Sequence, residues 1–145
     1  MLKGIDPRLD AHVLFALKAM GHGDTLVVCD TNFPADAIAR QTGLGQLISV
    51  ANVSAPDAVE AILSLLPVEA AARMEVMGAP DEIPPVQAEV QEVLTAHEPG
   101  AGRLSGVERF AFYEEAKKAF CVVATGERRF YGCFILTKGV IPPEA

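Results

Sequence analysis

The sequence predicts an α/β layered single domain, in which helices pack on a mostly parallel central sheet with an antiparallel edge pair. Three observations lead to this fold class. Helix and strand patterns alternate over most of the chain, and two strand patterns then end it. The run Leu26–Cys29 is continuously apolar, as in a strand covered on both faces. The length of 145 residues suits one domain, 1–145, with a substantial core.

The first helix is predicted over residues 7–20. Asp6 has the side chain of an N-cap, and Pro7 is favoured at the first helical position. Apolar residues recur at helical spacing, and Gly21 occupies the usual place just after a helix. The buried strand at Leu26–Cys29 follows directly, and Asp30 ends it.

The remaining elements follow from capping residues, periodicity and turn residues. Ser54 is the predicted cap of one helix, and two prolines at 84 and 85 open another. Helices are predicted near 35–41 and over 55–66, 84–97 and 109–118. Strands are predicted over 47–51, 73–77 and 103–107. The last two strands, 119–125 and 131–138, are expected to form a hairpin or a close relative around Gly126-Glu127.

The composition excludes several classes of protein. The net charge is −7 and no cluster of lysines and arginines is present, which argues against nucleic-acid binding. No apolar run approaches the length of a membrane span, and the N-terminus lacks the pattern of a signal peptide, so a cytoplasmic protein is expected. Half of the residues are hydrophobic. Because obligate interfaces resemble a domain core cut in half, this surplus predicts a homo-oligomer.

Neither metal nor nucleotide chemistry is indicated. Cys29, Cys121 and Cys133 lie far apart without a CxxC motif, and Cys29 and Cys121 are predicted to be buried free thiols in a reducing compartment. No cluster of histidine, cysteine and aspartate has the spacing of metal ligands. A nucleotide-binding α/β regulator would need a glycine-rich phosphate loop, and Gly43-Leu44-Gly45 is too short for one.

His22 and Asp30 are the first candidates for a functional site. They flank the apolar strand, so we expect them to share one pocket. His22 lies between two glycines, where it is either a surface capping residue or a general acid/base that titrates near neutral pH. Asp30 is either a turn aspartate or a carboxylate that orients the imidazole or a substrate hydroxyl.

Arg109 and Tyr131 are the second pair of candidates. An arginine at a helix start opposes the helix dipole, which suggests that it holds a polar ligand; the alternative is a salt bridge to Glu108 or Glu114. Tyr131 precedes Gly132, and a glycine within a strand often marks the close approach of a ligand or another chain. The alternative for Tyr131 is a core or interface aromatic.

Several motifs resemble one known family. They are Met20-Gly21-His22-Gly23-Asp24, Asp30 with Phe33-Pro34-Ala35, Arg109-Phe110-Ala111-Phe112-Tyr113-Glu114, Thr125-Gly126-Glu127-Arg128, Tyr131-Gly132 and Lys138-Gly139-Val140. Together they resemble the L-fucose mutarotase branch of the RbsD/FucU family, whose other branch is D-ribose pyranase. The resemblance covers nearly the whole chain. The third motif, and the fourth and fifth motifs together, are specific to the fucose branch.

The resemblance implies an RbsD-like fold and a set of site residues. The family's proton-donor histidine falls on His22, and its sugar-binding aspartate and arginine fall on Asp30 and Arg109. Its tyrosine-glycine-asparagine triplet falls on Tyr131, Gly132 and Cys133. The cysteine departs from the family pattern, and a thiol is a weaker donor and acceptor than an amide. This departure bears on the preferred sugar more than on the reaction.

The resemblance further implies an isomerase without metal or organic cofactor that works as a ring-shaped homo-oligomer, often a decamer, with sites near subunit boundaries. Mutarotation needs one group to protonate the ring oxygen and another to deprotonate the anomeric hydroxyl. We expect His22 to act as acid/base, with Asp30 and Tyr131 assisting, and L-fucose as the monosaccharide substrate. The rival hypothesis is a non-catalytic sugar-binding or transport-accessory protein that uses the same pocket.

Overall fold

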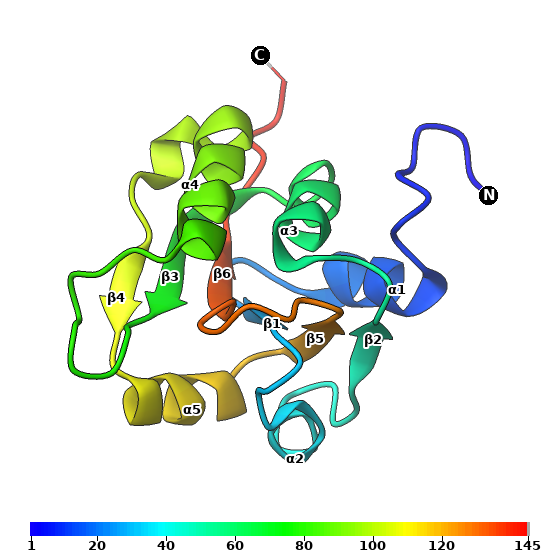
Figure 1. The fold of residues 1–145 in the computed structure, drawn as a ribbon. Coiled ribbons are helices and arrows are strands. Elements are labelled where there is room, and N and C mark those ends of the chain that lie inside the picture. Colours follow the sequence, from blue (N-terminus) through cyan, green and yellow to red (C-terminus); the bar gives the residue numbers. More distant parts are fainter. Residues whose placement is uncertain (145) are drawn as a thin grey trace.

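Six strands form one sheet in the order β2-β5-β1-β6-β3-β4 (Figure 1). The computed structural model describes residues 1–144. The helices are α1 (Ala11–Ala19), α2 (Ala35–Ala39), α3 (Ala55–Leu63), α4 (Pro85–His97), the 3₁₀ turn η1 (Pro99–Ala101) and α5 (Arg109–Lys117). The strands are β1 (Thr25–Cys29), β2 (Ile48–Val50), β3 (Val68–Met74), β4 (Ser105–Val107), β5 (Cys121–Thr125) and β6 (Phe134–Lys138).

The sheet is mostly parallel, which confirms the predicted α/β class. β2 and β1 both pair with β5 in parallel, and β4 pairs with β3 in parallel. β6 runs antiparallel to both of its neighbours, β1 and β3. The carboxyl ends of β1, β5 and β3 therefore lie on the same side of the sheet, where β6 begins.

The predicted hairpin of the last two strands is wrong, and so is its place at the edge of the sheet. β1 lies between β5 and β6, with Leu26 opposite Cys121 on one side and Leu136 on the other. β1 is covered on both faces, which places it in the interior of the sheet. An interior strand pairs along both of its edges, so β5 and β6 each pair with β1 and not with each other. The chain crosses the end of β1 between them, and the Thr31 amide donates to the Glu127 carbonyl at 2.8 Å.

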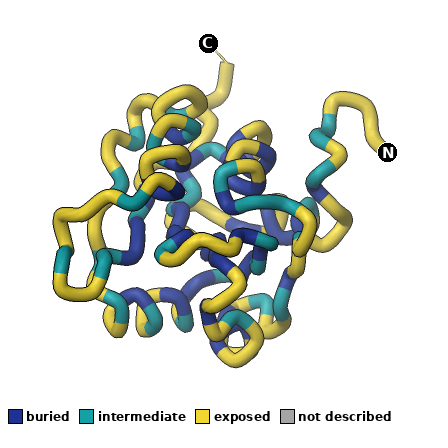
Figure 2. Tube along the Cα trace, viewed as in Figure 1, coloured by how far each residue is buried: buried dark blue, intermediate teal, exposed yellow. Residues whose placement is uncertain are grey.

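The two faces of the sheet carry separate cores. Leu26 and Val28 of β1 face a large core formed with α1, α3 and α4. Val27 and Cys29 face a smaller core formed with α2 and α5. Figure 2 shows buried strands in the middle and helices whose outer sides are exposed. This alternation of strand side chains is the three-layer arrangement expected of an α/β domain.

Several element boundaries differ from those predicted, and the starts of α1 and β3 differ most. α1 begins at Ala11, because the Asp10 carboxylate accepts from the Val13 amide and caps it, whereas Asp6 is paired with Arg8. β3 covers Val68–Met74 rather than 73–77, since pairing with β6 selects the strand conformation of an alanine-rich segment. The cap by Ser54 is confirmed: its hydroxyl accepts from the Asp57 amide.

Cys29 and Cys121 are buried free thiols, as predicted, and Cys133 is a third one. Among the described residues, no helix has both the length and the apolar character needed to span a membrane.

Candidate functional site

A pocket of about 340 Å³ opens where β1 and β3 end. Its volume lies within the range of about 300–1,000 Å³ that is usual for small-molecule sites. The pocket combines a carboxylate and a guanidinium with aromatic and sulfur-containing side chains. Its lining residues are Asp30, Asn32, Phe33, Met74, Arg109, Tyr113, Phe130, Tyr131 and Cys133. Four of the residues predicted for the site, Asp30, Arg109, Tyr131 and Cys133, therefore meet here.

Asp30 is fixed in the pocket wall by backbone amides. Its Oδ1 accepts from the amides of Asn32 at 3.0 Å and Phe33 at 3.1 Å, and its Oδ2 accepts from the Gly132 amide at 3.1 Å. The interpretation of Asp30 as a turn aspartate is confirmed, and its carboxylate also lines the pocket. An ionised carboxylate has about four acceptor positions, so these three bonds leave one for a ligand hydroxyl.

Arg109 enters from the first turn of α5. Its Nε donates to the Tyr113 hydroxyl at 2.9 Å, and its guanidinium carbon lies 5.5 Å from the centre of the Tyr113 ring. The alternative prediction, a salt bridge from Arg109 to Glu108 or Glu114, is wrong. Glu108 accepts from two backbone amides as the cap of α5, and these bonds lower the pKa of its carboxyl. Glu114 pairs with Lys117 instead. Nη1 of Arg109 donates to Sδ of Met77 at 3.5 Å. The other guanidinium N–H groups are left for a polar ligand.

Tyr131 has an unusual backbone. Its φ is +62°, the left-handed region that bulky residues rarely adopt. Its hydroxyl oxygen accepts from the Met77 amide at 3.1 Å, which leaves its own O–H free to donate. A strained residue at a pocket wall is a common feature of functional sites.

Gly132 and Cys133 complete the wall beside Tyr131. Gly132 lies before β6 and not within a strand as predicted. A Cβ on it would lie 2.8 Å from Cγ of Glu127 and 3.4 Å from Cβ of Asp30, so side chains of the same chain approach this glycine closely. Cys133 is only 2% exposed. Burial, with the neighbouring Asp30 carboxylate adding to it, raises the pKa of the Cys133 thiol well above its usual range, so the thiol is neutral at pH 7.

Glu127 organises the loop that carries Tyr131. Its Oε1 accepts from Nη2 of Arg129 at 2.9 Å, and its Oε2 accepts from Nε and the backbone amide of Arg129 at 3.1 Å. Burial raises the pKa of the Glu127 carboxyl, but the bonds from Arg129 outweigh this effect and leave the pKa lowered. The loop is thus held by a charged pair whose acidic member is 5% exposed.

His22 lies elsewhere, and the expectation that one chain brings it together with Asp30 is wrong. The imidazole is exposed, and its Nε2 lies 3.0 Å from Oε2 of Glu69, at the start of β3. His22 precedes β1 and Asp30 follows it, and a strand of this length separates its ends by about 13 Å. The sequence places the two residues close together along the chain, but the strand extends between them.

The sequence interpretation missed five lining residues: Asn32, Phe33, Met74, Tyr113 and Phe130. Tyr113 could have been found, because it lies four residues after Arg109 on a predicted helix and so shares its face. The sequence does not indicate that Met74 lines the pocket, because the position of its side chain depends on the register of β3 against β6. Among residues 1–144, no group of three or more histidine, cysteine, aspartate or glutamate side chains is placed to hold a metal ion.

Comparison with known proteins gives consistent similarities over nearly the whole chain. Residues 3–141 match the profile of the RbsD / FucU transport protein family. The chain is 42% identical to the fucose mutarotase of Danio rerio over 154 residues, covering 99% of this chain and 97% of that protein. The crystal structure of protein Atu2016 is 60% identical with a TM-score of 0.95, covering 98% of this chain and 97% of that one. The fucose mutarotase of Streptococcus pneumoniae in complex with L-fucose is 32% identical with a TM-score of 0.87, covering 97% of this chain and 100% of that one.

Proposed function

Since the chain belongs to the RbsD/FucU family, we propose that it is a monosaccharide mutarotase that interconverts the anomers of L-fucose. The observation that carries the proposal is the meeting of Asp30, Arg109 and Tyr131 in one pocket at the ends of β1 and β3. These groups can accept a proton, orient hydroxyl groups and donate a proton, which is what opening and closing a sugar ring requires.

The pocket chemistry suits a 6-deoxy sugar. Asp30 offers an acceptor and Arg109 offers donors, so hydroxyl groups of the sugar can be paired. Phe33, Met74 and the neutral thiol of Cys133 supply apolar surface, which suits a methyl group better than a hydroxyl. L-Fucose carries both kinds of group.

In the proposed reaction, the anomeric hydroxyl loses its proton as the ring oxygen gains one. The bond between the anomeric carbon and the ring oxygen breaks, the aldehyde end rotates, and the reverse steps close the ring on the other face. The free O–H of Tyr131 is a donor for the ring oxygen, and Asp30 is an acceptor for the anomeric proton. Such general acid–base groups typically contribute about 10²–10⁴-fold to a rate.

We propose that His22 completes the pocket of a neighbouring copy of the chain, where its imidazole acts as the acid/base that Asp30 and Tyr131 assist. Large exposed apolar side chains surround the pocket mouth: Phe130 is 72% exposed, Phe110 59% and Met77 56%. A second apolar surface lies beyond the other end of β1, near His22, and includes Leu2, Leu65 and Ile141. Exposed apolar patches of this kind mark interaction surfaces. Contact between two different patches is heterologous, and it closes into a ring when the rotation between copies allows, which supports a cyclic homo-oligomer.

We place the protein in the cytoplasm. Three free buried thiols support a reducing compartment, because disulfides form and persist in oxidising ones.

The experiment that tests the function is anomer exchange measured by saturation-transfer NMR on a panel of free sugars. If the protein is a mutarotase, we expect it to accelerate anomer exchange of L-fucose more than that of D-ribose or D-glucose. A non-catalytic sugar-binding protein would bind L-fucose yet leave exchange at the buffer rate, and that result would favour the rival hypothesis.

A further inference from the structure

The peptide group between Tyr131 and Gly132 is held on both sides by side chains. Its N–H, on Gly132, donates to Oδ2 of Asp30 at 3.1 Å. Its carbonyl, on Tyr131, accepts from Nε2 of Gln87 at 3.0 Å. A rotation of this peptide would break both bonds and turn the N–H away from the carboxylate. The orientation of one peptide thus connects Gln87 on α4 to two residues of the pocket.

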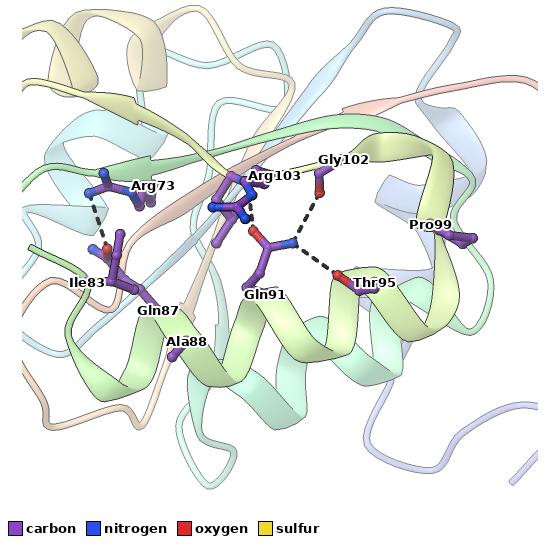
Figure 3. A pocket seen from close by; sticks show the side chains of 10 residues that line it. Arg73, Ile83, Gln87, Ala88, Gln91, Thr95, Pro99, Gly102 and Arg103 are labelled. Carbon is purple, nitrogen blue, oxygen red and sulfur yellow. Dashed lines mark hydrogen bonds between the residues drawn. The ribbon is translucent and has the colours of Figure 1, made fainter. Parts of the chain in front are cut away.

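The side-chain amide of Gln87 makes all of its hydrogen bonds inside the protein. The side chain is 0% exposed, and its second N–H donates to the Met74 carbonyl at 2.7 Å. Its oxygen accepts from Nη1 of Arg73 (Figure 3), and the two atoms lie 3.4 Å apart. Both N–H groups therefore bind carbonyls of residues that line the pocket, while Arg73 fixes which end of the amide faces them. A buried polar side chain with every donor paired favours a single conformation.

Tyr131 needs such external support. Among residues 1–144 it is the only non-glycine residue with a positive φ. Backbone in this region persists only when the surrounding structure holds it. The Met77 amide holds the hydroxyl end of the side chain, and Gln87 holds the carbonyl end of the residue. Together they fix where the ring lies relative to Asp30.

We propose that Gln87 is a positioning residue of the mutarotase site. It does not line the sugar pocket, and it acts by holding the Tyr131–Gly132 peptide so that the Tyr131 ring and the Asp30 carboxylate keep their relative placement. The inference rests on the proposed function, because it assigns Gln87 to that reaction. It extends the site from the pocket wall into the interior of the layer formed by α4.

The helix also supplies a matched control. Gln91 lies one turn after Gln87 on α4 and likewise binds backbone: its Nε2 donates to the Gly102 carbonyl, and its Oε1 accepts from the Leu104 amide (Figure 3). None of these partners lines the sugar pocket. Gln87→Met and Gln91→Met therefore make the same chemical change on one helix, and they differ in whether the lost bonds reach the site.

The kinetic test compares L-fucose exchange in the two variants. Gln87→Met lowers kcat by roughly 10- to 100-fold, because a displacement of about 1 Å can cost 10²-fold, with KM changed less than about threefold. Gln91→Met keeps the wild-type kcat. Gln87→Glu keeps the size and an acceptor for Arg73 but loses both donors, so it gives the same loss and serves if Gln87→Met does not fold.

A double-mutant cycle distinguishes positioning from general damage. If Gln87 acts through Tyr131, adding Gln87→Met to Tyr131→Phe lowers the rate by less than about twofold. A purely structural role would lower the rate equally in both backgrounds, and that outcome would overturn the proposal. Equal kcat in wild type, Gln87→Met and Gln87→Glu would overturn it as well.

A spectroscopic measurement keeps this inference separate from the proposed function. The chain has two tyrosines and no tryptophan, so in a Tyr113→Phe background the fluorescence reports on Tyr131 alone. We expect time-resolved anisotropy to show a more mobile Tyr131 ring in the folded Gln87 variants. In Gln91→Met we expect the mobility of this ring to stay as in wild type. If wild type failed to accelerate sugar exchange, the mutarotase proposal would fall while this measurement still decided the role of Gln87. Unchanged anisotropy in the Gln87 variants would overturn it.

Discussion

The Gly132 amide donates a 3.1 Å hydrogen bond to Oδ2 of Asp30, so two residues 102 positions apart meet in one buried contact. Asp30 follows β1, and Gly132 lies just before β6, the antiparallel neighbour of β1. The contact therefore forms only when the last strand has paired with the first. The pocket is a product of the complete sheet rather than of any local segment.

Arg109 is predicted to act through the planar shape of its guanidinium. Arg109→Lys keeps the charge but loses the fork of donors and the bond to Tyr113. We expect kcat/KM for L-fucose exchange to fall by about 10- to 100-fold, mostly through a higher KM, because one charge-assisted hydrogen bond contributes about 1.5–3 kcal/mol. Arg128→Lys, an exposed change outside the pocket, is the control. Equal kinetics for both variants would show that Arg109 does not bind the sugar.

The contribution of His22 from a neighbouring copy can be tested by mixing two inactive variants. His22→Ala and Asp30→Asn are each expected to lose most activity. When subunits of the two are mixed equally, about a quarter of the shared sites combine an intact His22 with an intact Asp30, so about a quarter of the activity returns.

The control for this mixture uses two changes on the same side of the site. Asp30→Asn mixed with Arg109→Lys should show no recovery beyond the activity of the separate variants, because every pocket keeps one defect. Absence of recovery in the His22 mixture, despite subunit exchange, would refute the shared site. A monomer by light scattering would refute it more simply.

Gly126 is predicted to tolerate no side chain. A Cβ there would lie 2.0 Å from the Ala51 carbonyl oxygen, a backbone atom that cannot move aside easily. We expect Gly126→Ala to lower the free energy of unfolding by about 3 kcal/mol or more. Gly100→Ala, where the structure has open space, should change it by less than about 0.5 kcal/mol. Thermal denaturation followed by circular dichroism compares the two, and equal midpoints would contradict the close approach.

The pair of Glu127 and Arg129 predicts a pH dependence of stability. The pKa of the Glu127 carboxyl is lowered in the folded chain from its ordinary value of 4.5, so its stabilisation is present above pH 4.5 and is lost as the pH falls through the folded value. We expect Glu127→Gln to lower the free energy of unfolding by about 1–2 kcal/mol at pH 7. The difference from wild type should shrink at acidic pH.

Denaturant titrations at a series of pH values measure this effect. Glu92→Gln, an exposed change on α4, is the control and should leave the pH profile of wild type unaltered. A Glu127→Gln curve that stays parallel to wild type from neutral to acidic pH would show that the charge of Glu127 contributes nothing.

Local sequence signals predicted much of the fold. The apolar run of β1, the cap at Ser54 and the prolines before α4 are short-range features, and the structure contains each element that they indicated. The Asp6-Pro7 signal failed because Asp6 is paired with Arg8, and a second aspartate four residues later caps the helix. Two adjacent cap signals cannot be ranked without the tertiary contacts.

Strand pairing could not be predicted from the local sequence. β5 and β6 are neighbours along the chain, and a hairpin is the simplest connection between such strands, yet both pair with β1. The same limit applied to the site. Asp30, Arg109 and Tyr131 were identified from local conflicts and resemblance, whereas Met74 and Gln87 matter through contacts made after the sheet has formed. The prediction that His22 and Asp30 of one chain lie together was wrong for the same reason, because their separation depends on how β1 extends in the sheet.

The most direct test of the proposed chemistry compares L-fucose anomer exchange by saturation-transfer NMR in wild type and Asp30→Asn at equal protein concentration. The substitution keeps the side-chain shape and removes the proton acceptor at the pocket wall. We expect accelerated exchange in wild type and exchange near the buffer rate in the folded variant. Equal acceleration by both proteins would contradict the assignment of the reaction to this pocket.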